Sequence, residues 1–566
     1  MNKAIYKVRN FSNFREMLFQ SVTAYGHSPA FKVKNPVGQI YTVSYKRYYT
    51  HVMNLGTALM NLGLEDCRIA IAGANSYKWC LGYMSVVCGA GVAVPVDKEL
   101  PFDDIKSILE VSEAKAIIFD EKFGKKLLEH RSELPDDMIY ISMEKKQDAD
   151  GILSLDRLVE KGGELIAEGY MDYVNKEVMG NKLTVLLFTS GTTGMAKAVM
   201  LSAENICSDI RSIMGIVKIN HGERILSVLP MHHTYECTVT FLCCIYGGVT
   251  ICFSDGLRYI TKNLQEYKPH ILIVVPLMLE KFYGRIQKAI EKERGSAFKV
   301  NVGHALSKAA GIFGVDASSF FFAKIKEAFG GEIRLIISGA AGIEPKILRD
   351  MNKYGINTFQ GYGLTECSPI IICNSDKENK PDSIGRALPN VEIMLSNCDE
   401  NGVGEICVKG PMVMLGYYRD EQATRACFDT DGWFHTGDLG RVDEDGYYYI
   451  CGRCKSVIVT RNGKNVYPEE LEALLTKEPA VKECIVSGAE DEKGNTVVFA
   501  RIFPDTKAIM AMHGNRNVDE DDIDEAVSEA VKNINNQVVS YKMIKRFEIV
   551  SKEFAKTTTS KIKRNQ

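Results

Sequence analysis

The sequence predicts an α/β protein with a large, layered N-terminal domain and a small α+β C-terminal domain. Two observations support this fold class. From about residue 68 onward, short apolar runs of strand length alternate with amphipathic stretches. Near the C-terminus, closely spaced strand-like runs surround one acidic helical stretch. A chain of 566 residues has room for several domain-sized units.

The elements of the large domain follow from local patterns. Each predicted strand is a run of about four to seven mostly apolar residues, as expected for buried strands. These runs lie at 68–73, 114–120, 183–188, 271–276 and 334–338. Helices are predicted at 102–111, 202–214 and 345–354, and Ser202 is a suitable N-cap for the second.

The uncharged segment from Trp79 to Val96 is nearly long enough to cross a bilayer. Three glycines and Pro95 interrupt it and would break a single spanning helix. We therefore expect a buried helix that ends near Cys88, followed by a strand from Val92 to Val96.

The remaining stretches complete the chain. Residues 284–331 carry no clear strand pattern or motif and are interpreted as a helical insertion. Strands are predicted at 481–489, 496–503 and 545–550, with a helix at 519–535. A joint is expected at 452–456, between a glycine-aromatic turn and the strand 457–460.

Composition and charge exclude several classes of protein. Hydrophobic residues make up 45% of the chain and charged residues 25%, values typical of a globular protein. The net charge is −3, so no overall attraction to nucleic acid is expected. The 16 cysteines are scattered and no secretory segment opens the sequence, which favours reduced thiols and a cytoplasmic location.

The loop after the strand at 183–188 is rich in glycine and hydroxyl groups. Glycine allows backbone N–H groups to converge on an anion, and a nearby lysine adds positive charge. The loop residues are Thr189, Ser190, Gly191, Thr192, Thr193, Gly194 and Lys197. This spacing differs from that of a Walker A motif, and by itself the loop is as consistent with a flexible turn as with phosphate binding.

Further motifs follow in a fixed order. They are LPMHHTYE (229–236), ISGAAG (337–342), GYGLTE (361–366), WFHTGDLG (433–440), GRCKS (452–456) and FAKTTTSKIKR (554–564). Together they resemble the motifs of the adenylate-forming superfamily, which includes acyl-CoA synthetases, peptide-synthetase adenylation domains and luciferases. The resemblance extends from about Asp97 to Arg564 and implies an acyl-CoA synthetase-like fold.

This resemblance implies binding of ATP and Mg²⁺. A carboxylate must attack a phosphate although both are anions, so cations and oriented donors have to converge on them. The loop from Thr189 to Lys197 would bind the β- and γ-phosphates. Glu366 and Thr189 would hold Mg²⁺, which prefers hard oxygen ligands. The structural alternative for Glu366, considered apart from the other motifs, is a glutamate that stabilises a helix N-terminus.

The nucleoside contacts are implied by the same resemblance. Asp438 would accept hydrogen bonds from the ribose hydroxyls, and Arg453 would donate nearby. The adenine ring would lie against small or aromatic groups, because larger side chains would fill its space. These residues are Gly339, Ala340, Ala341, Tyr362, Gly363 and Thr365.

Two residues are assigned to the first reaction step by the resemblance. Lys561 matches the adenylation lysine, which would neutralise charge between the carboxylate and the α-phosphate. His233 would act as a gate near the carboxylate, whereas a packed core histidine is the structural alternative. For Lys561, the alternative is a solvated basic tail.

The second step, transfer to CoA, involves the small domain. In the resembling enzymes this domain rotates after adenylation, and Lys455 lies at the pivot position. The resemblance implies a large domain at 1–452, a hinge at 453–456 and a small mobile domain at 457–566, with one ATP site between the domains. Residues 459–472 would face CoA. Cys451 and Cys454 form a C-x-x-C pair, but no second pair stands at zinc-ligand spacing.

Four residues depart from the usual pattern of the superfamily. They are Ala196, Ala198, Ala555 and Ser560, which replace proline or glycine near the phosphate loop and Lys561. None of them removes a charged group, so they bear on loop flexibility and rate more than on the type of reaction.

The motif at 229–236, which includes Glu236, resembles that of long-chain fatty acid–CoA ligases. A medium- or long-chain fatty acid is therefore the expected substrate, with Val275, Pro276, Leu277, Gly361 and Gly363 as implied pocket walls. Peripheral membrane contact is compatible with such a substrate. The alternatives are loading of an acyl-carrier protein, an aryl or short-chain acid ligase, and a catalytically silent nucleotide-binding protein.

Overall fold

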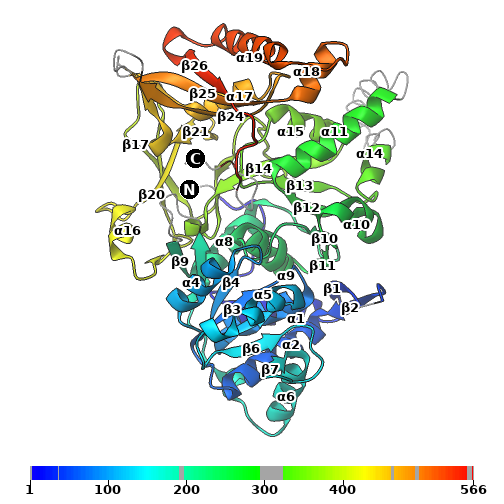
Figure 1. Cartoon of the computed structure of the whole chain (residues 1–566). Coiled ribbons are helices and arrows are strands. Elements are labelled where there is room, and N and C mark those ends of the chain that lie inside the picture. The colour runs from blue at the N-terminus through cyan, green and yellow to red at the C-terminus, as the bar shows by residue number, and fades with distance from the viewer. Residues whose placement is uncertain are drawn as a thin grey trace. The chain divides into compact units, whose positions relative to one another are not determined.

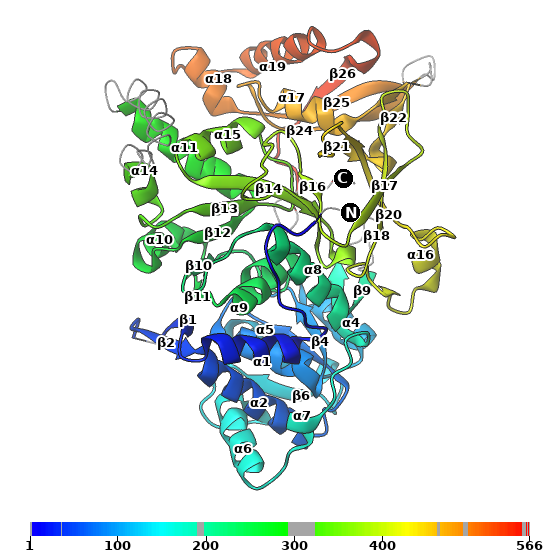
Figure 2. The ribbon, with the colours of Figure 1, turned by 180° about the vertical axis from the view of Figure 1, so that it is seen from behind.

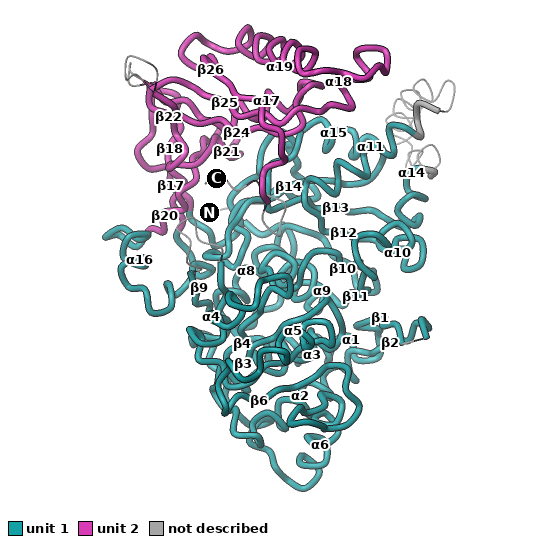
Figure 3. The backbone as a smooth tube through the Cα atoms, in the orientation of Figure 1, with its two compact units in different colours: residues 1–392, 409–432 teal, residues 393–408, 433–566 magenta. Residues whose placement is uncertain are grey.

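The computed structural model describes residues 3–35, 37–189, 197–292, 323–460, 464–490, 496–556, 562 and 564. The chain forms two compact units (Figure 3). Unit 1 contains residues 1–392 and 409–432, and unit 2 contains residues 393–408 and 433–566. The chain therefore passes between the units three times.

Unit 1 contains an eight-stranded sheet with the order β19-β9-β8-β4-β3-β5-β6-β7 (Figure 1). Neighbouring strands are parallel except where β9 pairs with β8 and with β19. The strands are β3 (Cys67–Ala72), β4 (Gly91–Val96), β5 (Ala114–Phe119), β6 (Ile139–Ser142), β7 (Ile152–Ser154), β8 (Leu183–Thr189), β9 (Lys197–Ser202) and β19 (Gly416–Tyr417).

Helices cover both faces of this sheet. α4 (Phe102–Ser112) and α5 (Glu121–Glu129) share a buried core with Ile117 of β5. The next residue, Ile118, points to the other face, where a Cβ at Gly82 of α3 (Tyr77–Ser85) would lie 3.1 Å from it. Because both faces are buried, these strands read as continuous apolar runs.

The second sheet of unit 1 has nine strands in the order β16-β15-β14-β13-β12-β10-β11-β1-β2. Its centre is parallel, and α10 (Ile260–Tyr267), α11 (Pro276–Lys292) and α15 (Pro345–Lys353) pack against it (Figure 2). The strands are β1 (Pro29–Lys34), β2 (Ile40–Ser44), β10 (Arg224–Ser227), β11 (Thr250–Phe253), β12 (Ile271–Val274), β13 (Leu335–Ser338), β14 (Asn357–Gly363), β15 (Ile370–Cys373) and β16 (Arg386–Ala387).

The α8 helix (Ala203–Ile216) has Ser202 as its N-cap, as predicted, and the structure adds a capping box. The Ser202 hydroxyl accepts from the N–H of Asn205, whose side chain accepts from the N–H of Ser202. Other helices of unit 1 are α1 (Phe14–Tyr25), α2 (Tyr45–Asn61), α6 (Leu155–Ala167), α7 (Asp172–Asn175), α9 (Cys243–Gly247), α14 (Ala323–Ala328), α16 (Glu421–Ala426) and the π-helical segment η3 (Tyr235–Leu242).

Unit 2 contains a four-stranded sheet and a small α+β part. The four strands, in spatial order, are β17 (Glu392–Ser396), β18 (Gly404–Lys409), β20 (Phe434–Val442) and β21 (Tyr448–Arg453). The remaining elements are η6 (Cys454–Ser456), β22 (Ile458–Val459), β23 (Asn465–Val466), α17 (Pro468–Leu475), β24 (Val481–Glu490), β25 (Thr496–Pro504), α18 (Thr506–Met512), α19 (Glu520–Asn535) and β26 (Ile544–Ile549). The helices α17 and α19 share a buried core with β24 and β25.

The predicted mixed α/β class is confirmed, and the named strands and helices appear within a few residues of their expected bounds. The segment from Trp79 forms α3, the π-helical segment η1 (Val86–Ala90) and β4, and most of its side chains are buried. None of the helices described here is long and apolar enough to span a membrane. The expected helical insertion falls mostly on 293–322, outside the described residues. The domain boundary at 452–457 stays a prediction.

Candidate active site

The phosphate-loop motif joins two antiparallel strands of the eight-stranded sheet. Thr189 ends β8 and Lys197 begins β9, and these two residues are paired across the hairpin. The Thr189 hydroxyl donates to the carbonyl of Lys197 at 3.3 Å. Ser190, Gly191, Thr192, Thr193 and Gly194 lie outside the described residues. The hairpin therefore brings together the two described members of the motif.

Tyr417 of β19 contacts two of the predicted site residues. The Lys197 ammonium lies 4.6 Å from the centre of the Tyr417 ring, within the range of a cation–π contact. The Tyr417 hydroxyl donates to a carboxylate oxygen of Glu366 at 2.9 Å. Burial and the Glu366 charge raise the pKa of Tyr417 well above its usual value, so the phenol stays protonated as a donor. One tyrosine therefore contacts both Lys197 and Glu366.

Sequence patterns did not single out Tyr417. The residue belongs to a two-residue strand that pairs with β9, and its partner in register is Val199. Its place beside Glu366 arises from this pairing, which joins parts of the chain about 200 residues apart. No local motif signals such a contact.

The GYGLTE motif spans the end of β14 and a 3₁₀ turn at Thr365–Cys367. The Leu364 N–H donates to the carbonyl of Pro369 at 2.8 Å, which folds the segment back on itself. A Cβ at Gly363 would lie only 1.8 Å from that carbonyl oxygen, so the turn requires glycine here. Tyr362, Gly363, Thr365 and Glu366 are thus held on one short turn.

The ISGAAG motif follows β13. Gly339 donates its N–H to the carbonyl of Val274 at 3.1 Å. A Cβ at Gly339 would approach the Tyr235 ring to 2.6 Å. Ala340 has a φ of +69°, a backbone conformation that is uncommon for residues other than glycine. Of the predicted adenine-facing residues, Gly339 is therefore packed against η3, whereas Ala340 and Ala341 are exposed.

The two histidines lie in the turn that precedes η3. Their ring centres are 4.1 Å apart, and the His232 Nε2 lies 3.5 Å from a carboxylate oxygen of Asp97. Burial lowers the pKa of His232 well below its usual value, with His233 as the next cause. His232 is therefore neutral, and the predicted gate residue His233 has a neutral ring beside it.

Glu236 of η3 is fully buried. Its two carboxylate oxygens accept hydrogen bonds from Ser227 at 2.6 Å and from Thr240 at 2.8 Å. Burial raises its pKa to about 8 in spite of these bonds. Glu236 is thus a protonated core group near neutral pH that ties η3 to the end of β10.

The ribose-binding candidates lie in unit 2. Asp438 of β20 and Arg453 of β21 are paired across the two strands, and Arg453 Nε lies 3.2 Å from Asp438 Oδ1. The Asp438 N–H donates to the Thr436 hydroxyl at 3.1 Å. Lys455, the predicted pivot, follows in η6. Lys561 lies outside the described residues.

The structure therefore brings the predicted residues together in two groups. The group in unit 1 contains Thr189, Lys197, Tyr362, Gly363, Thr365 and Glu366. His233 lies next to this group, because the hydroxyl of the neighbouring residue Thr234 is 3.5 Å from the hydroxyl of Thr365. The group in unit 2 contains Asp438, Arg453 and Lys455. Their catalytic and binding roles remain predictions.

Family models match most of the chain. The AMP-binding enzyme family matches residues 18–418, and the C-terminal domain of AMP-binding enzymes matches residues 455–566. The chain belongs to the AMP-binding enzyme family. The adenylate-forming superfamily predicted from the motifs is thereby confirmed.

Curated relatives of this AMP-binding enzyme are similar over most of their length. The long-chain-fatty-acid–CoA ligase FadD15 of Mycobacterium bovis is 28% identical over 535 residues, which cover 89% of this chain and 87% of the relative. The long-chain-fatty-acid–CoA ligase ACSBG1 of Rattus norvegicus is 29% identical over 500 residues, covering 84% and 69%. The predicted class, an AMP-forming acid–thiol ligase, agrees with these names.

Solved structures share the fold. An anthranilate CoA ligase, AuaEII, superposes with a TM-score of 0.74 at 19% identity, covering 98% of this chain and 96% of that protein. A fatty acyl CoA synthetase from Mycobacterium tuberculosis gives 0.65 at 23% identity, covering 97% and 96%. At these identities the match shows a common fold and leaves the substrate open.

Proposed function

We propose that this AMP-binding enzyme activates a medium- or long-chain fatty acid with ATP and transfers it to CoA. The products are acyl-CoA, AMP and pyrophosphate, with an acyl-adenylate as intermediate. The observation that carries the proposal is the near full-length similarity to ligases named for long-chain fatty acids. The site chemistry adds independent support.

The charges of the unit 1 group suit a polyphosphate with a metal ion. Lys197 provides positive charge at the start of β9, where the loop motif ends. Glu366 holds one carboxylate oxygen on the Tyr417 hydroxyl, and its second oxygen makes no hydrogen bond to any residue that the structure describes. That oxygen and the hydroxyl oxygen of Thr189 are hard ligands of the kind that Mg²⁺ prefers.

Mg²⁺ bound to these residues would neutralise phosphate charge. Lys197 and the Thr189–Lys197 hairpin would hold the phosphates in position, and Tyr417 would fix the Glu366 carboxylate. Asp438 would accept hydrogen bonds from the ribose, with Arg453 beside it as a donor. Lys561 would balance the charge that develops between the carboxylate and the α-phosphate.

An apolar cavity lies next to the turn that carries GYGLTE. Its volume is about 20 Å³, and no charged side chain lines it. The lining residues are Ile213, Ile216, Val217, Tyr235, Val239, Ile337, Gly361, Ile370 and Cys373. A space of this volume admits about one water molecule, far less than the ~300 Å³ or more of a ligand pocket, so it does not itself indicate which acid is bound. Gly361, one of the implied wall residues, lines this cavity, whereas Val275, Pro276 and Leu277 do not.

Gly361 gives a direct test of the acyl pocket that the resemblance implies. A Cβ at this position would lie 2.9 Å from the Cys373 sulfur. Gly361→Val should therefore shorten the acyl chain that is accepted. Gly342→Val serves as the control, because a Cβ at Gly342 meets no atom within 4 Å.

Mass spectrometry of the products tests the function as a whole. The enzyme would be incubated with ATP, Mg²⁺, CoA and an equimolar mixture of C2 to C18 acids. We expect fatty acyl-CoA and AMP, with Gly361→Val shifted toward shorter acids and Gly342→Val unchanged. Thioester formed only from aryl or C2 acids, or only with an acyl-carrier protein in place of CoA, would contradict the proposal. ATP binding without turnover would indicate a catalytically silent protein.

A further inference from the structure

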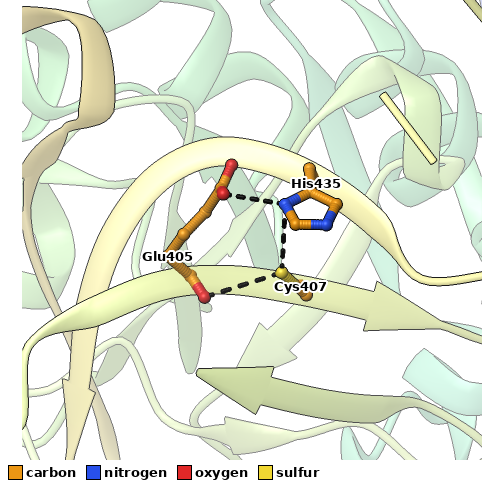
Figure 4. Close-up of side chains that lie close together, drawn as sticks. All are labelled: Glu405, Cys407 and His435. Atoms are coloured by element: carbon orange, nitrogen blue, oxygen red, sulfur yellow. Dashed lines mark hydrogen bonds and ion pairs between the residues drawn. The ribbon is translucent and has the colours of Figure 1, made fainter. Parts of the chain in front are cut away.

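Three side chains with metal-ligand chemistry meet in the four-stranded sheet of unit 2. They are Glu405 and Cys407 of β18 and His435 of β20 (Figure 4). One ligand atom from each lies within 4.8 Å of the other two. Glu405 and His435 are half-buried, and Cys407 is fully buried. The family assignment and the proposed reaction do not use this cluster.

The register of the sheet explains how the three residues meet. Cys407 and His435 are direct partners across the antiparallel pair of β18 and β20, so their side chains point to the same face. A register shift between Glu405 and Cys407 interrupts the regular ladder. Such a bulge re-aims side chains, and here it brings the Glu405 carboxylate to the same imidazole nitrogen that faces Cys407.

The distances match one face of a tetrahedral site. The His435 Nδ1 lies 2.8 Å from Glu405 Oε2 and 3.5 Å from Cys407 Sγ. A zinc ion with bonds of ~2.3 Å to sulfur and ~2.0 Å to nitrogen and oxygen would separate these ligands by about 3.6 and 3.3 Å. The sulfur–nitrogen distance therefore already fits, and the carboxylate would move by about half an ångström.

We propose that Glu405, Cys407 and His435 bind a thiophilic divalent cation, Zn²⁺ being the best match. Sulfur and imidazole ligands select zinc over magnesium, so the site is chemically distinct from the ATP-linked Mg²⁺ site. Binding would displace any proton on His435 Nδ1, to Nε2 when the ring is neutral, and would release the thiol proton of Cys407.

The bound ion would have a structural role, as a link between two strands of the sheet. It would tie β18 to β20 at His435, three residues before Asp438. The second carboxylate oxygen of Glu405 already accepts from the Gly437 N–H at 3.0 Å. The metal would thus fix the turn that presents Asp438, as a positioning site outside the reacting atoms.

Cobalt substitution of the full chain gives a direct readout. After chelator treatment, the protein would be titrated with Co²⁺, and the thiolate-to-cobalt charge-transfer band and the tetrahedral d–d bands would be recorded. We expect one Co²⁺ per chain with both signals. Competition with a chromophoric chelator would then give the Zn²⁺ affinity.

Single variants identify the ligands. Cys407→Ser should remove the charge-transfer band, and both Cys407→Ser and His435→Gln should weaken Zn²⁺ binding by at least about 100-fold. Cys398→Ser is the matched control, because Cys398 is an exposed thiol of the same unit and lies outside the cluster. If Cys407→Ser fails to fold, His435→Gln at the half-buried position of the cluster decides the question.

Two results would overturn the proposal. One is the absence of a stoichiometric Co²⁺ complex with a charge-transfer band. The other is Zn²⁺ binding that is the same in the wild type, Cys407→Ser and His435→Gln, which would reduce the cluster to a hydrogen-bonded pair in which Glu405 orients His435 and Gly437.

Discussion

Tyr417 contacts both charged side chains of the unit 1 group, Lys197 and Glu366. Its ring faces the Lys197 ammonium, and its hydroxyl donates to Glu366. Tyr417→Phe keeps the ring and removes only the hydrogen bond. A bond to a charged group contributes about 1.5–3 kcal/mol, so we expect kcat/KM for ATP to fall by about 10- to 100-fold. The fall in kcat/KM would be measured from steady-state pyrophosphate release at varied Mg²⁺ and ATP concentrations.

The neighbouring tyrosine provides a control. Tyr418 directs its hydroxyl to Arg68 and Glu113, away from Glu366. Tyr418→Phe should leave kcat/KM for ATP within a factor of two or so. Equal effects of the two substitutions would show that the Glu366 contact has no special role.

Glu236 makes the stability of the protein depend on pH. Burial raises its pKa from 4.5 to about 8, so the folded protein keeps a proton that the unfolded chain releases above pH 4.5. Stability from this residue is therefore full below about pH 4.5 and is lost as the pH rises toward 8. Glu236→Gln should remove this loss, on the order of 2–4 kcal/mol at pH 9.

Urea unfolding at pH 5 and pH 9 would measure the difference. The variant should be more stable than the wild type only at the higher pH. Glu110→Gln, at an exposed position of α4, should show the same pH dependence as the wild type. A Glu236→Gln protein with an unchanged pH dependence would contradict the prediction.

Site residues differ in how far the sequence predicts them. Glu366, Lys197 and Asp438 stand in local motifs whose order indicates ATP chemistry. Tyr417 and the Cys407–His435 pair depend on strand register, which no short motif encodes. Motif residues are therefore predicted even where they meet across strands, as Asp438 and Arg453 do, whereas contacts that strand register alone creates, such as those of Tyr417 and Cys407, are missed.

At the scale of elements, the turn at Gly363 is held by backbone contact. A methyl group there would lie 1.8 Å from the carbonyl oxygen of Pro369, which cannot move without opening the turn. Gly363→Ala should therefore lower the free energy of unfolding by about 2 kcal/mol or more. Denaturant or thermal unfolding would measure the change.

The matched substitution is Gly342→Ala, four residues after the end of β13. The added methyl group has open space there, so the effect should stay within about 0.5 kcal/mol. If both substitutions were equally mild, the turn at Gly363 would be more compliant than its geometry indicates.

Elements with a clear local signal were predicted well. The capping pair of Ser202 and Asn205 marks α8, and apolar runs mark β3, β5 and β12. The helix α11 was missed at 276–283 because ILIVVP runs into it without an N-cap signal, and Pro276 reads equally as the end of a strand. Short strands such as β16 and β19 form only through their neighbours, so no local propensity reveals them.

For the whole molecule, the two-step reaction predicts separate effects on its half-reactions. Lys561→Ala should abolish acyl-adenylate formation, by about 10²-fold or more, and still convert supplied acyl-adenylate to thioester. Lys455→Pro should spare adenylation and block the thioester step, because proline fixes φ at the predicted pivot. Rapid-quench measurement of each half-reaction would resolve them.

Lys455→Ala is the matched control, since it removes the charge and leaves the backbone free. It should retain both half-reactions. Loss of both half-reactions in Lys561→Ala and Lys455→Pro, with both proteins folded, would remove the support for separate geometries.

The strand connections also have a consequence for recombination between related genes. A crossover at residue 392 or 408 would place β9 and β19 on different parental segments, and one at 432 would do the same to β18 and β20. A crossover directly after Arg453 separates no pair of hydrogen-bonded strands among the residues that the structure describes. Chimeras joined there would inherit every sheet from a single parent, so exchange of C-terminal segments at this point would be tolerated most readily in evolution and in the laboratory.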